Sequence, residues 1–130
     1  MKQELEAKLV ARWPEWFRVN GDIQQTLMSL GFQHSDGWFS LLSKLCEELE
    51  PLVAGWERNS GRSFEVLEVK EKFGSLRFYA NADDDLIQQR IETATLESLS
   101  ICEVCGRPGR LRQEGHISTL CDSCAQQRPE

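Results

Sequence analysis

The fold depends on one stretch of sequence, residues 64–80, which reads FEVLEVKEKFGSLRFYA. β-Branched and aromatic residues alternate there with polar ones, as is typical of strands that bury one face. A turn near Phe73-Gly74-Ser75 divides the stretch into two halves. The alternation changes parity between Val66 and Leu67, which indicates a β-bulge or a strand buried on both faces. The sequence therefore predicts a β-hairpin.

Two helices are predicted at the start of the chain. Apolar residues recur every three to four positions up to Pro14, which predicts a first helix over residues 2–13. Asp22 is a good helix cap, and Gly31 can close the short helix that follows it in a left-handed conformation. The hairpin is therefore preceded by helical segments.

A longer helix is predicted immediately before the hairpin. It begins at Ser35 or Asp36 and keeps its apolar spacing to Trp56. Pro51 interrupts it, so this is either one kinked helix or two helices packed end to end. A last helix follows the aspartates at 83–85, which can cap it and favour its positive end.

Four cysteines define the second unit of the chain. They form the pattern C-x₂-C-x₁₅-C-x₂-C, which is typical of a structural zinc site, and the predicted ligands are Cys102, Cys105, Cys121 and Cys124. We expect one structural Zn²⁺, because a site with four cysteines has no open position for substrate. A redox pair, an iron–sulfur cluster or His116 as a ligand fits the spacing less well.

These elements predict an α+β fold. Residues 1–100 should form a core domain of helices packed with the β-hairpin, and residues 101–130 a small C-terminal zinc ribbon. The ribbon is too short to remain folded without its metal.

Charge is unevenly distributed along the chain. The formal net charge is −6, with 11 basic and 17 acidic residues in 1–100 against 4 and 4 in 101–130. Four thiolates on one Zn²⁺ add about two negative charges. Such a surface repels a phosphate backbone on average, so we expect a basic protein partner rather than nucleic acid. Neither a membrane span nor a secretory signal is apparent, which favours a cytoplasmic protein with reduced thiols.

Two kinds of residue are candidates for binding a protein partner. Tryptophans near the first turn and acidic side chains on the helices could form such a surface, although a lid over the core, a solvated helix face and helix capping are the alternatives. The candidates are Trp13, Trp16, Glu47, Glu48, Glu50, Asp83, Asp84 and Asp85. The nucleic-acid alternative depends on three ribbon arginines, Arg107, Arg110 and Arg112.

The chain shows no pattern that predicts an enzyme. His34 precedes Ser35 and Asp36, but adjacent residues in one loop rarely converge as a catalytic triad. Phosphate-binding glycine loops and metalloprotease helices are not recognisable. We therefore expect a non-enzymatic protein without a small-molecule substrate.

Three segments together resemble a known family: VKEKFGSLRFY at 69–79, CEVCGRPG at 102–109 and TLCDSCA at 119–125. They are similar to small, mostly uncharacterised bacterial and phage proteins in which a KFG-LRFY hairpin precedes a four-cysteine zinc tail. Relatives of this type occur in prophages and beside polymorphic toxin genes. The resemblance, over roughly residues 60–125, implies zinc binding and an immunity or accessory role.

Two functions follow as expectations. The first is an acidic protein-binding module, most concretely an immunity-type inhibitor that occludes a basic toxin enzyme. The alternative is a phage or transcription-associated zinc-ribbon adaptor that binds nucleic acid or polymerase.

Overall fold

A computed structural model of the chain describes residues 1–18, 28 and 31–128. Its helices and strands are α1 (Gln3–Arg12), β1 (Phe32–Gln33), the 3₁₀ helix η2 (Asp36–Trp38), α2 (Phe39–Ser60), β2 (Val66–Lys72), β3 (Ser75–Ala80), α3 (Asp85–Ser98), β4 (Arg110–Arg112), β5 (Ser118–Leu120) and α4 (Asp122–Gln127). These elements confirm the predicted α+β class. The short helix expected from Asp22 to Gly31 lies almost wholly outside the described residues.

The predicted hairpin forms two strands of a three-stranded sheet. β2 and β3 are antiparallel, and their register shifts between Val66 and Glu68, which confirms the bulge. β1 adds to the other side of β2 in parallel, so the order is β1-β2-β3. The sequence did not indicate β1, because two residues are too few for an alternation to be recognised.

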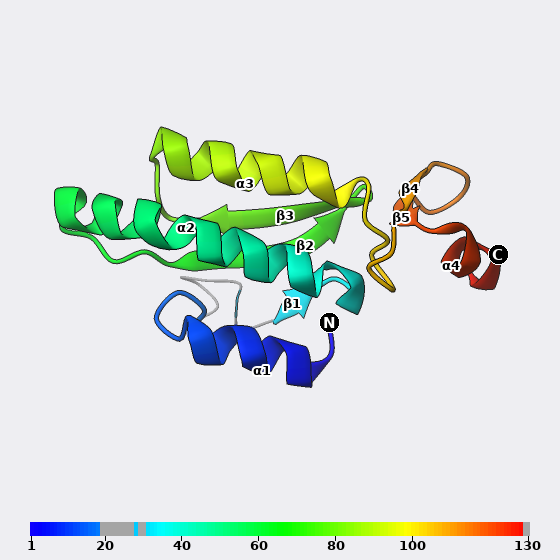
Figure 1. Ribbon diagram of the computed structural model, residues 1–130, viewed down its shortest axis with the longest axis horizontal. Coiled ribbons are helices and arrows are strands. Elements are labelled where there is room, and N and C mark those ends of the chain that lie inside the picture. Colours follow the sequence, from blue (N-terminus) through cyan, green and yellow to red (C-terminus); the bar gives the residue numbers. More distant parts are fainter. Residues whose placement is uncertain (19–27, 29–30, 129–130) are drawn as a thin grey trace.

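One face of the sheet is covered by helices. Val69 and Phe78 lie opposite each other in the register, and both are buried in the main hydrophobic core. α2 and α3 pack against each other, and α3 runs alongside β3 (Figure 1). Because side chains alternate along a strand, Lys70 and Arg77 lie on the opposite face.

The long helix is continuous. α2 passes through Pro51, whose ring is exposed, so the missing N–H leaves a gap only on the solvent side. It ends at Gly61, which has φ of +72° and donates its N–H to the Glu57 carbonyl. No helix among the described residues combines the length and apolar character needed to cross a bilayer.

α1 is held against α2 by polar contacts. Arg12 pairs with Glu47, and the Trp13 indole N–H donates to the Glu50 carboxylate at 2.8 Å. The ribbon of β4, β5 and α4 lies beyond one end of the sheet (Figure 1).

Candidate metal centre

The four predicted cysteines come together at one point. All their sulfur atoms lie within 4.8 Å of one another. The Sγ atoms of Cys105 and Cys121 are 3.6 Å apart, far beyond the roughly 2.05 Å of a disulfide bond. A tetrahedral site with metal–sulfur bonds of about 2.3 Å has edges of about 3.8 Å. These residues could therefore hold a tetrahedral metal ion, and zinc is the metal we propose.

The first pair of cysteines is shaped by a tight turn. The Gly106 N–H donates to the Cys102 carbonyl at 2.9 Å, and the Cys102 N–H donates to the Arg107 carbonyl at 2.8 Å. Gly106 has φ of +82°, which a residue with a Cβ adopts only at a cost. The local sequence thus directs both sulfurs of this pair to one side.

The second pair begins a helix. Cys121 is the N-cap of α4, and its sulfur accepts a hydrogen bond from the Cys124 N–H at 3.4 Å. Donors of this kind stabilise a thiolate, as does the positive end of a helix.

The thiol pKa values are shifted in opposite directions. Burial raises the pKa of Cys102, but main-chain N–H groups, including that of Cys121, outweigh it and lower the pKa to about 7. Hydrogen bonding to Cys121 raises the pKa of Cys124 to about 12. Thiols this close together cannot all ionise, because each thiolate repels the next, so some keep their protons. A bound divalent cation would compensate the negative charge of the thiolates, so this set of donors suits a metal.

The first turn of the metal centre packs directly on the core domain. The Gly37 N–H donates to the Glu103 carbonyl at 2.6 Å, and the Trp38 indole N–H donates to the Ile101 carbonyl at 2.9 Å. The Ser35 N–H donates to the Glu103 carboxylate. A Cβ on Gly37 would lie 2.5 Å from the Glu103 carbonyl oxygen and still closer to that of Cys102. Only glycine allows this approach.

The ribbon also contacts the turn of the main hairpin. The Thr119 hydroxyl donates to the Gly74 carbonyl at 2.7 Å, and both residues are buried. A Cβ on Gly74 would overlap the side chain of Leu111. The four-cysteine ribbon is thus joined to the core at two places that are about forty residues apart in sequence.

The residues predicted to bind a protein have internal partners here. Trp13 and Trp16 are buried, and Trp16 packs edge-on against Phe64 at 5.0 Å between ring centroids. Glu47 and Glu50 contact α1, as described above. Their role in binding stays a prediction.

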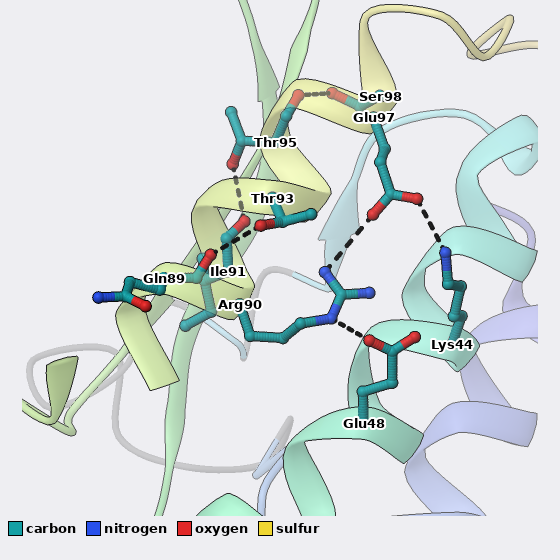
Figure 2. Close-up of polar contacts among 9 residues, drawn as sticks. All are labelled: Lys44, Glu48, Gln89, Arg90, Ile91, Thr93, Thr95, Glu97 and Ser98. Atoms are coloured by element: carbon teal, nitrogen blue, oxygen red, sulfur yellow. Dashed lines mark hydrogen bonds and ion pairs between the residues drawn. The ribbon is translucent and has the colours of Figure 1, made fainter. Parts of the chain in front are cut away.

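Glu48 belongs to a network between α2 and α3. It pairs with Arg90, which also lies 3.5 Å from Glu97, and Glu97 in turn pairs with Lys44 at 2.9 Å (Figure 2). The Arg90 side chain is only 13% exposed. The hydrogen bond from Arg90 lowers the pKa of Glu48. Glu48, from the acidic face of α2, therefore links α2 to α3.

The aspartates at the start of α3 are placed as the capping alternative predicted. Asp84 is the N-cap, and its carboxylate accepts the Ile87 N–H at 3.0 Å. Asp85 lies in the first helical turn, and Asp83 is exposed.

The three ribbon arginines do not share one environment. Arg107 and Arg110 are exposed, whereas Arg112 donates to the Leu120 carbonyl and to Asp122, and its side chain is 11% exposed. A nucleic-acid role for them stays a prediction.

Phe73 was not among the binding residues predicted from the sequence. Its φ is +52°, and its side chain is 65% exposed. A Phe-Gly pair at the centre of a two-residue turn was the available signal, because both central residues of a type I′ turn need positive φ.

No protein-family model, no curated protein and no solved structure matches this chain.

Proposed function

We propose that this protein is a non-enzymatic, zinc-stabilised binding module that engages a protein partner through the tip of its β2–β3 hairpin. The observation that carries the proposal is Phe73, an exposed aromatic residue in a left-handed conformation. That conformation costs about 1–2 kcal/mol for a residue with a Cβ. Strain together with an exposed apolar ring marks a functional position, since neither benefits the fold.

The ribbon supports this tip from behind. The Gly74 N–H donates to the Glu71 carboxylate at 2.8 Å, while the Gly74 carbonyl accepts from Thr119 of the ribbon. The N–H and the carbonyl of Gly74 are thereby both hydrogen-bonded, and the ring of the adjacent Phe73 extends into solvent. A rigid aromatic side chain loses little entropy on binding, which is why such residues are often interface hot spots. The metal would act by keeping this support folded.

A basic partner suits the charge of the chain as a whole, although the Lys72 ammonium lies 5.7 Å from the centroid of the Phe73 ring. The chain has a net charge of −6. Burial raises the pKa of Glu103, and the neighbouring Glu71 carboxylate raises it further. A cation from a partner would relieve this repulsion between two carboxylates. Together with the family resemblance, these charges support an immunity-type inhibitor that occludes a basic toxin enzyme.

The test replaces Phe73 without disturbing the turn. Asn-Gly is the preferred centre of a type I′ turn, so Phe73→Asn should keep the hairpin folded while it removes the ring. Leu86→Asn is the matched control, because Leu86 is also an exposed apolar residue but lies on α3. Each tagged protein is expressed in the native host and purified under mild conditions.

We expect one stoichiometric protein to co-purify with the wild type and with Leu86→Asn, and to be lost with Phe73→Asn. Inhibition of the co-purified enzyme by the wild type would identify the immunity role. Recovery of the same partner by Phe73→Asn, or of no stoichiometric partner by the wild type, would overturn the proposal.

A further inference from the structure

A pocket lies in the ribbon, beside the turn of the main hairpin. Its volume is about 360 Å³, and its walls include the apolar residues Val104 and Leu120 together with Glu103. Ser118 also lines it, and the Cα of Ser118 is only 3.4 Å from the position that a Cβ on Gly74 would take. The turn between β2 and β3 is at the end of the sheet nearest the ribbon (Figure 1). We call this cavity the ribbon pocket.

Two neighbouring carboxylates at the ribbon pocket lack a cation. Glu103 is half-buried and accepts the Ser35 N–H at 2.9 Å, and Glu71 places a second negative charge near it. Neither Glu103 nor Glu71 forms an ion pair with a cation in the described part of the chain. By contrast, the half-buried Glu65 and Glu68 each pair with one. A carboxylate that is partly removed from water is costly without such a partner.

The basic residues of the ribbon pocket do not compensate these charges. The Arg128 guanidinium donates to the carbonyls of Glu114 and His116, each at 2.9 Å, and to the Ser118 hydroxyl at 2.6 Å. Arg128 is therefore used within the ribbon. The exposed His116 lines the same pocket and makes no ion pair with Glu103 among the described residues.

We propose that the ribbon pocket binds an arginine side chain of the protein partner. This inference rests on the proposed function, because the pocket lies beside the turn that carries Phe73. The guanidinium donates to the Glu103 carboxylate, and the methylene groups of the arginine pack on Val104 and Leu120. Such a pocket, mostly apolar with one well-placed charge, is typical of sites that bind a side chain or a small ligand.

The chemistry of the pocket favours arginine over the other candidates. An anion would be repelled by Glu103 and Glu71. A lysine ammonium is a strongly hydrated point charge, whereas a guanidinium is planar, more weakly hydrated and rich in donors, so it enters a partly apolar pocket at a lower cost. Arginine is also enriched among the residues that contribute most to protein interfaces.

The test is a titration of the whole zinc-loaded protein with N-acetyl-arginine N-methylamide, followed by the methyl NMR signals of Val104 and Leu120. We expect saturable shifts of both signals with a dissociation constant of about 1–10 mM, as suits one side chain without the rest of an interface. The citrulline counterpart has nearly the same shape but no charge. It should bind at least tenfold more weakly.

Two variants locate the site. Glu103→Gln keeps an oxygen for the Ser35 N–H and removes the charge, so it should weaken the arginine probe at least tenfold. Glu114→Gln is the matched control, because it removes the same charge from an exposed ribbon residue that is outside the pocket lining; it should bind the probe within about twofold of the wild type. Elemental analysis checks that both variants keep their zinc.

A third variant blocks the pocket without touching Glu103. Gln127 is an exposed residue of α4 that lines the ribbon pocket, and arginine suits a helix as well as glutamine does. Gln127→Arg supplies a guanidinium from the chain itself, so it should also weaken the probe at least tenfold. This variant decides the question even if Glu103→Gln loses its metal.

Three results would each overturn the inference: no shift of the Val104 and Leu120 signals up to about 50 mM probe, equal binding of the citrulline compound, or wild-type affinity in Gln127→Arg. None of these measurements uses the partner. Phe73→Asn should bind the probe like the wild type, so a failure here and a failure of the co-purification assay are separate results.

Discussion

Replacement of Gly37 by alanine tests the attachment of the metal centre to the core. The added Cβ would lie 2.5 Å from the Glu103 carbonyl oxygen and 2.6 Å from its carbon, whereas ordinary contacts begin at 3.4 Å. These are main-chain atoms beside Cys102 of the four-cysteine cluster, so they cannot rotate away as a flexible side chain would. The ribbon must shift by about an ångström, or the two units must separate.

The expected cost has two parts. Overpacking of this kind costs about 1–3 kcal/mol. Displacement of Glu103 also weakens the hydrogen bond from the Gly37 N–H, which is worth about 1 kcal/mol. We therefore expect Gly37→Ala to lower the free energy of unfolding by about 2–4 kcal/mol, a large part of the 5–15 kcal/mol typical of a domain.

Metal affinity should fall with stability. Binding of a structural metal is coupled to folding of its site, so a ribbon that docks less favourably binds its metal less tightly. A loss of about 1.4–2.8 kcal/mol in this step corresponds to a ten- to hundredfold lower affinity. Urea denaturation followed by tryptophan fluorescence measures the first effect, and competition with a chromophoric chelator measures the second.

Gly55→Ala is the matched control. Gly55 lies within α2, and the nearest atom to an added Cβ is the far end of Arg58 at 3.9 Å. Alanine should stabilise this helical position by about 0.5–1 kcal/mol. A Gly37→Ala protein with wild-type stability and wild-type metal affinity would refute the reasoning, because the close approach of Gly37 to the ribbon could not then exist in solution.

Three further predictions concern the metal, the helix network and acid stability. Elemental analysis should find one zinc per chain, and absence of zinc from the wild type would contradict the proposed site. Cys105→Ser should lower the amount of zinc that resists a chelator, while the helical circular dichroism stays largely intact. Arg90→Met should lower the free energy of unfolding by about 1–2 kcal/mol, because it removes the partly buried cation that pairs with Glu48 and leaves Glu97 to Lys44 alone. Arg12→Ala, at a pair more than half exposed, should cost under about 0.5 kcal/mol, and equal losses from the two variants would count against the network. Burial lowers the pKa of His34 from 6.5 to about 4, so the unfolded chain binds a proton that the folded chain excludes, and stability should fall by up to about 1.4 kcal/mol per pH unit from pH 6.5 toward 4. His34→Gln should remove that component of the pH dependence, and an unchanged slope would show that the imidazole is accessible to solvent.

The four-cysteine cluster was predictable from the sequence because its geometry is local. Two residues between cysteines allow both sulfurs to face one point, whatever the rest of the chain does. Gly106 forms the turn within the first pair, and Cys121 caps α4 within the second. The hairpin and its bulge were predictable for a similar reason, since alternation and its change of parity are properties of neighbouring residues.

The partners of polar side chains were not predictable in this way. Glu47, Glu48 and Glu50 form an acidic stripe in sequence, yet their contacts come from residues 35–42 positions away. The sequence gives no measure of which distant cation will lie beside a carboxylate, because that depends on how two helices are packed. A stripe that suggested a docking surface therefore contributes to the packing of α1 and α3 on α2.

Sequence alone thus determined the elements whose causes are local: helices from apolar spacing, the hairpin from alternation, and the four-cysteine cluster from cysteine spacing. The tertiary structure decided what depends on distant parts of the chain. Gly37 is required because a carbonyl some sixty-five residues away approaches it, and the Phe73-Gly74 turn is held by a hydroxyl group of the distant ribbon. Close approach and exposure are relations between segments, so only the folded chain defines them.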